Sequence, residues 1–231
     1  MRMLGLIGGM SWESTAIYYR HLNELVRERR GGLHSARLLL WSVDFATVAE
    51  LQHAGDWDGA AALLEQAAAR LETAGAEALV LCTNTMHRVA NRIEMAGAIP
   101  LLHIADATAA GAQRRGVRRP ALLATRFTME EAFYRDRLRD RHGIEALVPD
   151  AAERALVHEV IYDELCQGVV LPKSRNAFLG IVERLRSEEG ADGVILGCTE
   201  IAMLLGPNDL DLPLLDSTRL HAEAAIAWAL R

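Results

Sequence analysis

The sequence has few cysteines, no excess of basic over acidic residues and no long hydrophobic run, and each shortage excludes a class of protein. Three cysteines in 231 residues form no disulfide framework and have no zinc-ligand spacing, so we expect a cytoplasmic protein without a metal. The net charge of −6 argues against a nucleic-acid partner, which requires a basic surface. The apolar runs are too short for a membrane span. No cleavage site follows the first apolar residues, so no signal peptide is expected.

Common motifs for cofactors and nucleophiles are also missing. Gly5, Gly8 and Gly9 do not have the spacing of a dinucleotide-binding fingerprint. The chain contains neither a Walker P-loop nor a Gly-x-Ser-x-Gly nucleophile elbow. No low-complexity linker separates one part of the chain from another.

One short stretch occurs twice. Residues 190–200 read GADGVILGCTE, and residues 75–85 read GAEALVLCTNT. The two copies align without gaps at an offset of 115 (190 − 75), so Cys198 corresponds to Thr83. Each copy predicts a short buried strand followed by a turn with polar side chains. A second pair of segments, IPLLH at 99–103 and LPLLD at 212–216, repeats in the same order.

Strand and helix patterns alternate along the whole chain. Apolar runs predict strands at 4–7, 37–43, 78–81, 99–104, 121–124, 145–148, 194–196 and 212–216. Helical spacing predicts helices after Ser11 and at 57–73, 85–95, 105–115, 129–142, 153–166, 173–189 and 218–230. The alternation predicts parallel βαβ units. We therefore expect an α/β fold of two doubly wound sheets related by pseudo-twofold symmetry, with domains at 1–104 plus 216–231 and at 105–215.

Polar or flexible residues follow several of the predicted strands. Ligands of doubly wound sheets bind beyond the carboxyl ends of the strands. The candidate groups at these ends are Gly8-Gly9-Met10, Thr83-Asn84-Thr85, Thr125 and Cys198-Thr199-Glu200. The pseudo-symmetry would place the second and fourth groups across one cleft. We therefore expect an active site between the domains, with chemistry from both walls.

These motifs resemble those of a known family. The turns Asn84-Thr85-Met86-His87 and Gly197-Cys198-Thr199-Glu200 are similar to those of aspartate/glutamate racemases. The wider superfamily includes hydantoin racemases, arylmalonate decarboxylases and maleate isomerases. The opening residues 8–14 (GGMSWES) and residues 32–36 (GLHSA) look closest to its L-aspartate/L-glutamate-specific branch. The resemblance covers nearly the whole chain. It implies two flavodoxin-like domains, no cofactor, a small dicarboxylic amino-acid substrate, and a homodimer as one option for assembly.

Racemisation without a cofactor needs one group to remove the Cα proton and another to return a proton on the opposite face. We expect Cys198 to act as the thiolate acid/base, stabilised by a following helix N-terminus. Thr83 takes the second position. The alternative interpretation of Cys198 is a small buried hydrophobic residue. The resemblance and the chemistry together suggest a set of substrate-binding residues, namely Met10, Gln52, Asn84, Thr85, Thr125, Thr199, Glu200 and Lys173.

Several of these residues also have a purely structural interpretation. Glu200 could orient Cys198 or the substrate ammonium, or simply favour a helix N-terminus. Lys173 could hold a side-chain carboxylate, although solvated lysines are far more common. Gln52 could instead be an exposed loop residue. Cys82 lies one place before the aligned position, so strand alternation turns it away from the direction of Thr83, and we expect it in the core.

The threonine at position 83 departs from the common family pattern, in which both halves carry a cysteine. A threonine hydroxyl is no useful base at neutral pH, but it can donate or relay a proton. We therefore expect the two directions of proton transfer to be unequal. Three hypotheses remain open at this point: a racemase of L-aspartate or L-glutamate, a one-thiol decarboxylase or isomerase of the same superfamily, and a dicarboxylate-binding protein without chemistry.

Overall fold

The computed structural model describes residues 1–231 and divides them into two compact units. Unit 1 contains Met1–Ile104 and His221–Arg231, and unit 2 contains Ala105–Leu220. The sequence suggested a return to the first domain at residue 216, whereas the chain enters unit 1 again at His221. The residues just before this point belong to unit 2, because the Ser217 hydroxyl donates to the Leu196 carbonyl at 2.7 Å. Both units have α/β architecture with parallel strands, as expected.

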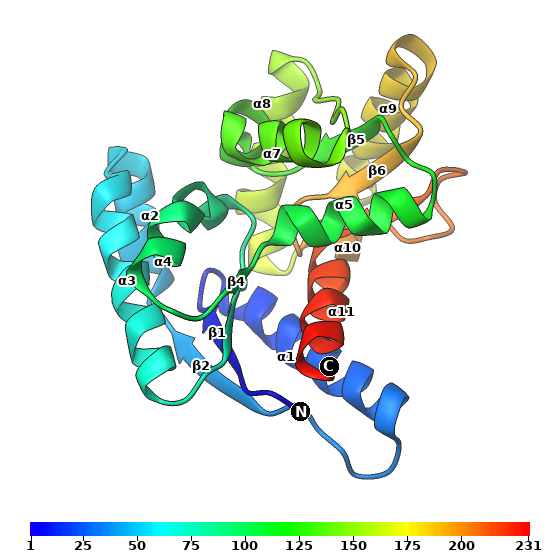
Figure 1. Ribbon diagram of the computed structural model, residues 1–231. Coiled ribbons are helices and arrows are strands. Elements are labelled where there is room, and N and C mark those ends of the chain that lie inside the picture. Colours follow the sequence, from blue (N-terminus) through cyan, green and yellow to red (C-terminus); the bar gives the residue numbers. More distant parts are fainter. The chain divides into compact units, whose positions relative to one another are not determined.

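The sheet of unit 1 has four parallel strands in the order β2-β1-β3-β4. Helices cover both faces, as Figure 1 shows for the blue and cyan part of the chain. One face packs against α3 and α4, and the other packs against α1 and α11. The strands are β1 (Leu4–Gly8), β2 (Leu38–Ser42), β3 (Ala78–Leu81) and β4 (Leu101–Leu102). The helices are α1 (Trp12–Arg30), α2 (Phe45–Ala54), α3 (Trp57–Thr73), the 3₁₀ helix η1 (Thr85–Val89), α4 (Ala90–Ala96) and α11 (Ser217–Ala229).

Local sequence signals define several of these boundaries. Ser11 caps α1 by accepting a hydrogen bond from the backbone N–H of Ser14. Asp56 caps α3 in the same way through Gly59. Side chains of alternating residues along β3 enter opposite cores, because strand residues point alternately to the two faces. This alternation decides which residues at the end of β3 are available to a ligand.

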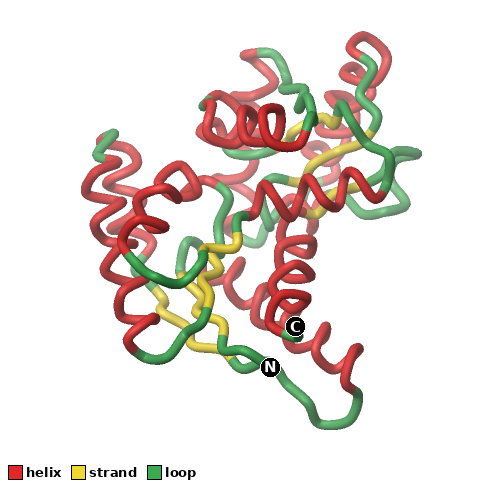
Figure 2. Tube along the Cα trace, in the orientation of Figure 1, coloured by secondary structure: helices red, strands yellow, loops and turns green.

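The sheet of unit 2 has three parallel strands in the order β5-β6-β7, drawn as short yellow segments in Figure 2. The strands are β5 (Pro120–Leu123), β6 (Gly193–Leu196) and β7 (Leu214–Asp216). The helices are α5 (Ile104–Arg114), α6 (Arg126–Glu130), α7 (Ala132–His142), α8 (Ala151–Glu159), α9 (Pro172–Glu189) and α10 (Ile201–Leu204). The strand predicted at 145–148 is wrong, because only an isolated bridge between Ala121 and Leu147 forms there. The Glu145 and Leu147 N–H groups still donate to the Arg118 and Pro120 carbonyls at 2.9 Å, so this segment runs beside β5 without forming a full strand.

The segment after α8 also differs from its prediction. Instead of one helix over 153–166, a π-helical turn η2 (Val160–Glu164) and a 3₁₀ turn η3 (Leu165–Gln167) follow α8. Gly168 ends the segment with a left-handed φ of 72°. π-Helical turns occur frequently at functional sites, so this interruption draws attention to the residues that it carries.

The repeat seen in the sequence is present in both sheets. Strands β3 and β6 have the same length and start at the same offset of 115 (193 − 78). Each lies between two parallel neighbours, β3 between β1 and β4 and β6 between β5 and β7. Thr83 and Cys198 therefore occupy the same position in their own units, two residues beyond the end of the strand.

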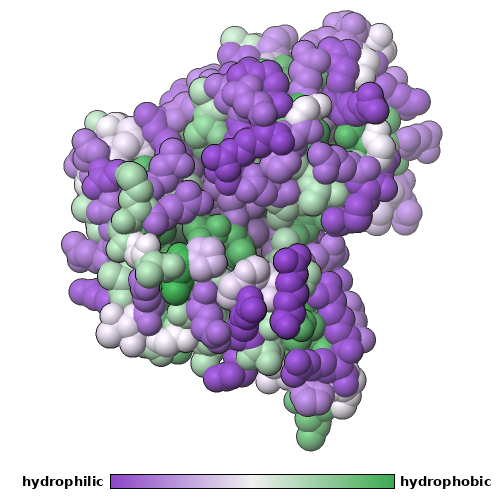
Figure 3. Space-filling view, viewed as in Figure 1, coloured by the Kyte–Doolittle hydropathy of each residue, from purple (hydrophilic) through white to green (hydrophobic).

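The hydropathy of the surface and of the helices bears on the environment of the chain. Figure 3 shows mostly hydrophilic residues on the face in view, with scattered hydrophobic ones. None of the helices combines the length and the apolar character that crossing a membrane requires.

Candidate active site

The candidate cysteine of unit 2 follows β6 after a glycine that the packing requires. A Cβ added to Gly197 would lie 2.8 Å from the Cβ of Ala124 at the end of β5. The Gly197 N–H donates to the Leu123 carbonyl at 2.7 Å, which holds the two strand ends together. Cys198 comes next and is partly exposed, whereas Thr199 beyond it is buried. The close approach of β5 and β6 therefore positions Cys198 at the carboxyl edge of the sheet.

A carboxylate lies directly beside the thiol. The Cys198 Sγ is 2.9 Å from Oε2 of Glu200, a residue only 4% exposed, and donates a hydrogen bond to it. Burial, then the negative charge of Glu200 and this hydrogen bond, raise the pKa of the Cys198 thiol well above its ordinary value. The resting group is therefore a thiol whose proton already points at a carboxylate.

This finding corrects one expectation from the sequence. We expected a helix N-terminus to stabilise a Cys198 thiolate, but the following helix α10 contains only four residues. So short a helix contributes little aligned dipole, and the nearby carboxylate acts in the opposite direction. The position of Glu200 therefore makes it the hydrogen-bond acceptor for the Cys198 thiol, and not a residue that stabilises a helix N-terminus.

The π-helical turn contributes an aromatic neighbour that the sequence did not reveal. Tyr162 on η2 is half-buried, and burial, followed by the electrostatic effect of Cys198, Cys166 and Glu200, raises the pKa of its hydroxyl to about 12. The hydroxyl therefore stays protonated and available as a donor. Its ring also lies against His158, with 4.7 Å between the centroids. No sequence periodicity indicates a π-helical turn, which explains why Tyr162 was missed.

Two other candidates in unit 2 have different surroundings. Thr125 follows β5 as the N-cap of α6 and is 7% exposed, with its hydroxyl 3.4 Å from that of Thr128. Because β5 pairs with β6, Thr125 lies on the same sheet edge as Cys198. Lys173 lies in the first turn of α9, with a side chain 76% exposed and its Nζ 3.6 Å from Glu164. Lys173 is therefore already paired with a carboxylate of its own unit.

In unit 1, hydrogen bonds fix the backbone of Thr83 on both sides. Its N–H donates to the Leu81 carbonyl at 2.9 Å, and its carbonyl accepts from Nδ1 of His87 at 2.7 Å. Thr83 is partly exposed, like Cys198 at the equivalent position. Cys82 is fully buried among the core residues of α1 and α11, as expected, and burial raises the pKa of its thiol. Thr83, not Cys82, is thus the accessible residue of this strand end.

The other candidates of unit 1 are buried polar or flexible side chains near the same end of the sheet. Asn84 and Thr85 begin the η1 helix and are 6% and 7% exposed. Gln52 on α2 is 5% exposed, with its Nε2 3.0 Å from the sulfur of Met86 and its buried Oε1 without a hydrogen-bond partner. Met10 packs in the same core as Met86. A buried amide oxygen without a partner is a feature that a ligand donor can satisfy.

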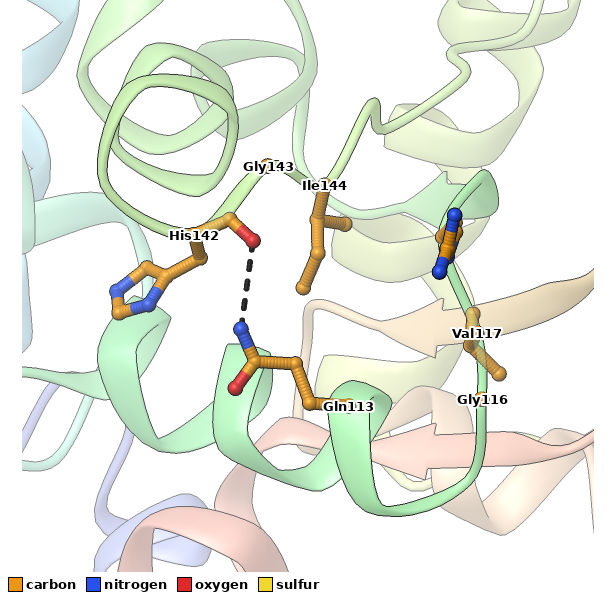
Figure 4. Close-up of a pocket in the computed structure, with 7 residues that line it drawn as sticks. Gln113, Gly116, Val117, His142, Gly143 and Ile144 are labelled. Carbon is orange, nitrogen blue, oxygen red and sulfur yellow. Dashed lines mark hydrogen bonds between the residues drawn. The ribbon is translucent and has the colours of Figure 1, made fainter.

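One pocket of unit 2 lies elsewhere. It has a volume of about 360 Å³, and its lining residues include Gln113, Gly116, Arg118 and His142 (Figure 4). The Gln113 side chain points toward His142 and donates to its backbone carbonyl at 3.3 Å. Residues 116–118 precede β5, so this pocket is at the amino edge of the sheet, whereas Cys198 is at the carboxyl edge. None of the predicted site residues lines it.

Comparison with known proteins identifies relatives over the full length of the chain. The family model for Asp/Glu/hydantoin racemases matches residues 7–225. The chain is 51% identical to a candidate Asp/Glu racemase of known structure from Yersinia pestis, with a TM-score of 0.94 and all of both chains covered. It is 33% identical to an aspartate racemase homologue from Pyrococcus horikoshii OT3, with a TM-score of 0.88 and the same full coverage.

A more distant curated relative has a described activity. The broad specificity amino-acid racemase RacX of Bacillus subtilis is 22% identical over 230 residues, which covers 97% of each chain. Family, fold and full-length coverage agree, and they favour an enzyme over the binding-protein alternative. The chain therefore belongs to the Asp/Glu/hydantoin racemase family and is, as a member, a cofactor-independent isomerase.

Proposed function

We propose that the protein interconverts the L and D forms of aspartate or glutamate by moving the proton at Cα, with Cys198 and Thr83 as the two acid/base groups. The observation that carries this proposal is their equivalent position two residues beyond β6 and β3, in the two copies of one repeat. Both side chains are partly exposed, while their neighbours in sequence are buried. Both belong to strand ends of the kind that bind ligands in such folds.

On the cysteine side, the thiol needs a base before it can accept a proton from the substrate. Glu200 Oε2, 2.9 Å from Sγ, takes the thiol proton as the sulfur removes the hydrogen from Cα. After this step the original thiol proton is on Glu200, the former Cα proton is on sulfur, and the substrate carbanion carries the negative charge. Tyr162, whose hydroxyl stays protonated, can donate a hydrogen bond to a nearby anion of this intermediate.

On the threonine side, the hydroxyl acts as a relay. Thr83 donates its proton to the opposite face of Cα while it accepts one from water, because a free threonine alkoxide is too basic to persist. Glu200 then releases the proton that it gained to solvent, which neutralises the hydroxide left by that water and restores the starting state. The reverse reaction requires this weak base to remove a proton. The Thr83 face therefore limits the interconversion, and we expect proton exchange at the Cys198 face to be faster.

The substrate is expected to be held by buried polar groups at the same sheet edges. The side chains of Asn84 and Thr85 in unit 1, and of Thr125 and Thr199 in unit 2, offer donors for carboxylates. The buried Gln52 Oε1 without a partner suits the substrate ammonium, and a 180° turn of the amide would offer its NH₂ to the distal carboxylate. Met10 would form an apolar wall. Lys173 would have to exchange its Glu164 partner for a substrate carboxylate.

The proposal is tested by hydrogen exchange at Cα in D₂O, using both enantiomers of aspartate and of glutamate. The wild-type protein is expected to incorporate deuterium into at least one of them and to form its mirror image. Cys198→Ala is expected to abolish the exchange while leaving the melting temperature close to that of the wild type. Exchange at the wild-type rate in Cys198→Ala, or consumption of substrate without exchange, would contradict the assignment.

A further inference from the structure

Three histidines are buried together beyond the carboxyl ends of β3 and β4 in unit 1. His87, His103 and His221 are 2%, 6% and 0% exposed. The ring centroids of His87 and His103 are 4.5 Å apart, and those of His87 and His221 are 5.8 Å apart. Histidine is rarely this buried unless its ring nitrogens have partners. The ring nitrogens of His87 and His221 are bonded to backbone groups of Thr83, Ile104 and Leu102.

The hydrogen bonds of His87 require a single neutral tautomer. Nδ1 is 2.7 Å from the Thr83 carbonyl oxygen, which can only accept, so Nδ1 carries the proton. Nε2 accepts the backbone N–H of Ile104 at 3.2 Å and therefore carries a lone pair. One imidazole thus joins the backbone of Thr83 to the first residue of α5.

His221 makes a parallel set of contacts in the same cluster. Its Nε2 is 2.6 Å from the Leu102 carbonyl and donates to it, and its Nδ1 accepts from the Tyr18 hydroxyl at 2.8 Å. Ile104 is the residue at which the chain leaves unit 1, and His221 is the residue at which it returns. The two points at which the chain leaves and re-enters unit 1 are therefore held by hydrogen bonds of this histidine cluster, close to the turn that carries Thr83.

The bond from His87 has a direct consequence for Thr83. The residue lies beyond the last ladder pair of β3, so the sheet no longer holds its carbonyl. Its N–H is held by Leu81 and its carbonyl by His87, and these two bonds fix both of its peptide planes. The direction of the Thr83 hydroxyl follows from this backbone.

We propose that His87 is a positioning residue that aims Thr83 at the substrate through the hydrogen bond from Nδ1 to the Thr83 carbonyl. This inference rests on the proposed function, because it assigns His87 to the Thr83 face of the proton transfer. His87 touches no reacting atom. Loss of the bond should slow inversion at the Thr83 face and leave exchange at the Cys198 face unchanged.

Two substitutions separate the two hydrogen bonds of His87. His87→Asn places an amide N–H close to the position of Nδ1 and retains the donor to Thr83. His87→Gln places an amide oxygen close to the position of Nε2 and retains only the acceptor for Ile104. The measured quantity is the early ratio of D product to deuterated L substrate in D₂O. We expect His87→Asn to remain within about twofold of the wild-type ratio and His87→Gln to lower it by roughly tenfold or more, since a displacement of about 1 Å can cost 100-fold in rate.

Tyr18→Phe is the matched control. It removes the hydrogen bond to His221 and perturbs the same cluster, but Tyr18 makes no hydrogen bond to Thr83. The ratio should be unchanged even if the protein melts at a lower temperature. Equal ratios for His87→Asn and His87→Gln, or an equal fall in Tyr18→Phe, would overturn the positioning role.

A second measurement does not depend on turnover. Nitrogen-15 spectra of the imidazole groups distinguish a protonated ring nitrogen from an unprotonated one, and His87→Asn identifies the His87 signals among the eight histidines. A proton on Nδ1 supports the proposal, and a proton on Nε2 overturns it. If the wild-type protein exchanges none of the four substrates, the proposed function fails by itself. The tautomer still reports whether His87 holds Thr83.

Discussion

Replacing Cys82 by serine tests which residue at the end of β3 faces the substrate. Cys82 is fully buried in the core formed with α1 and α11, and its Sγ is 3.8 Å from the Val80 carbonyl. A serine hydroxyl is attached by a shorter bond and extends less far than the sulfur. Serine therefore buries a hydroxyl with poor hydrogen bonding in an apolar core.

The expected loss of stability follows from that unsatisfied hydroxyl. A buried polar group without a good partner costs about 1–3 kcal/mol. For a chain of this size each kcal/mol lowers the melting temperature by about 2–4 °C, so Cys82→Ser should melt roughly 2–12 °C below the wild type. Cys166→Ser is the control, because Cys166 is partly exposed and its replacement should change stability by about 0.5 kcal/mol or less.

Tryptophan fluorescence is a suitable assay, because Trp12, Trp41, Trp57 and Trp228 all belong to unit 1. The denaturation midpoint and kcat are measured on the same preparation. We expect a lower midpoint with kcat within about twofold of the wild type. A large fall in kcat with an unchanged midpoint would mean that Cys82, rather than Thr83, faces the substrate.

Two further predictions concern charged groups. Glu200→Gln removes the proton acceptor of Cys198, so Cα exchange should fall by about 10²–10⁴-fold. Because the charge of Glu200 and its hydrogen bond raise the pKa of the thiol, the variant should be alkylated at lower pH, and an unchanged pH profile of alkylation would contradict this. For Asp106, burial is outweighed by hydrogen bonds from Arg137 and His142, which lower the pKa of its carboxyl. Its stabilising contribution is present above the ordinary carboxylate range and lost as the pH falls, so urea midpoints of Asp106→Asn should depend less on pH below about 4.

The architecture could be read from the sequence because it depends on apolar runs and on their repetition. Strand β3 begins and ends where predicted, and β6 differs by only one residue, since a buried parallel strand is a continuous apolar segment. The burial of Cys82 followed from the alternation of side chains along a strand. At residues 145–148 the local pattern predicted a strand, but only one bridge, between Ala121 and Leu147, and a few backbone hydrogen bonds to residues 118–122 form.

The chemistry at the strand ends was only partly predictable. The sequence identified Cys198 and Glu200 as neighbours, but the raised thiol pKa depends on burial and on a 2.9 Å contact. Tyr162 approaches this pair through a π-helical turn that no local pattern indicates. The role of His87 was equally hidden, since its two partners are four and seventeen residues away along the chain.

The central claim is that Thr83 and Cys198 serve opposite faces of one carbon atom, and Thr83→Cys tests it most directly. The assay measures D product and deuterated L substrate at early times in D₂O. The wild-type protein should incorporate deuterium into the L substrate faster than it forms D product, because the Thr83 hydroxyl on one face of Cα transfers protons more slowly than the Cys198 thiol on the other face. Thr83→Cys should raise the proportion of D product and increase net inversion in both directions. An unchanged proportion in a folded Thr83→Cys protein would show that Thr83 is not the second acid/base position.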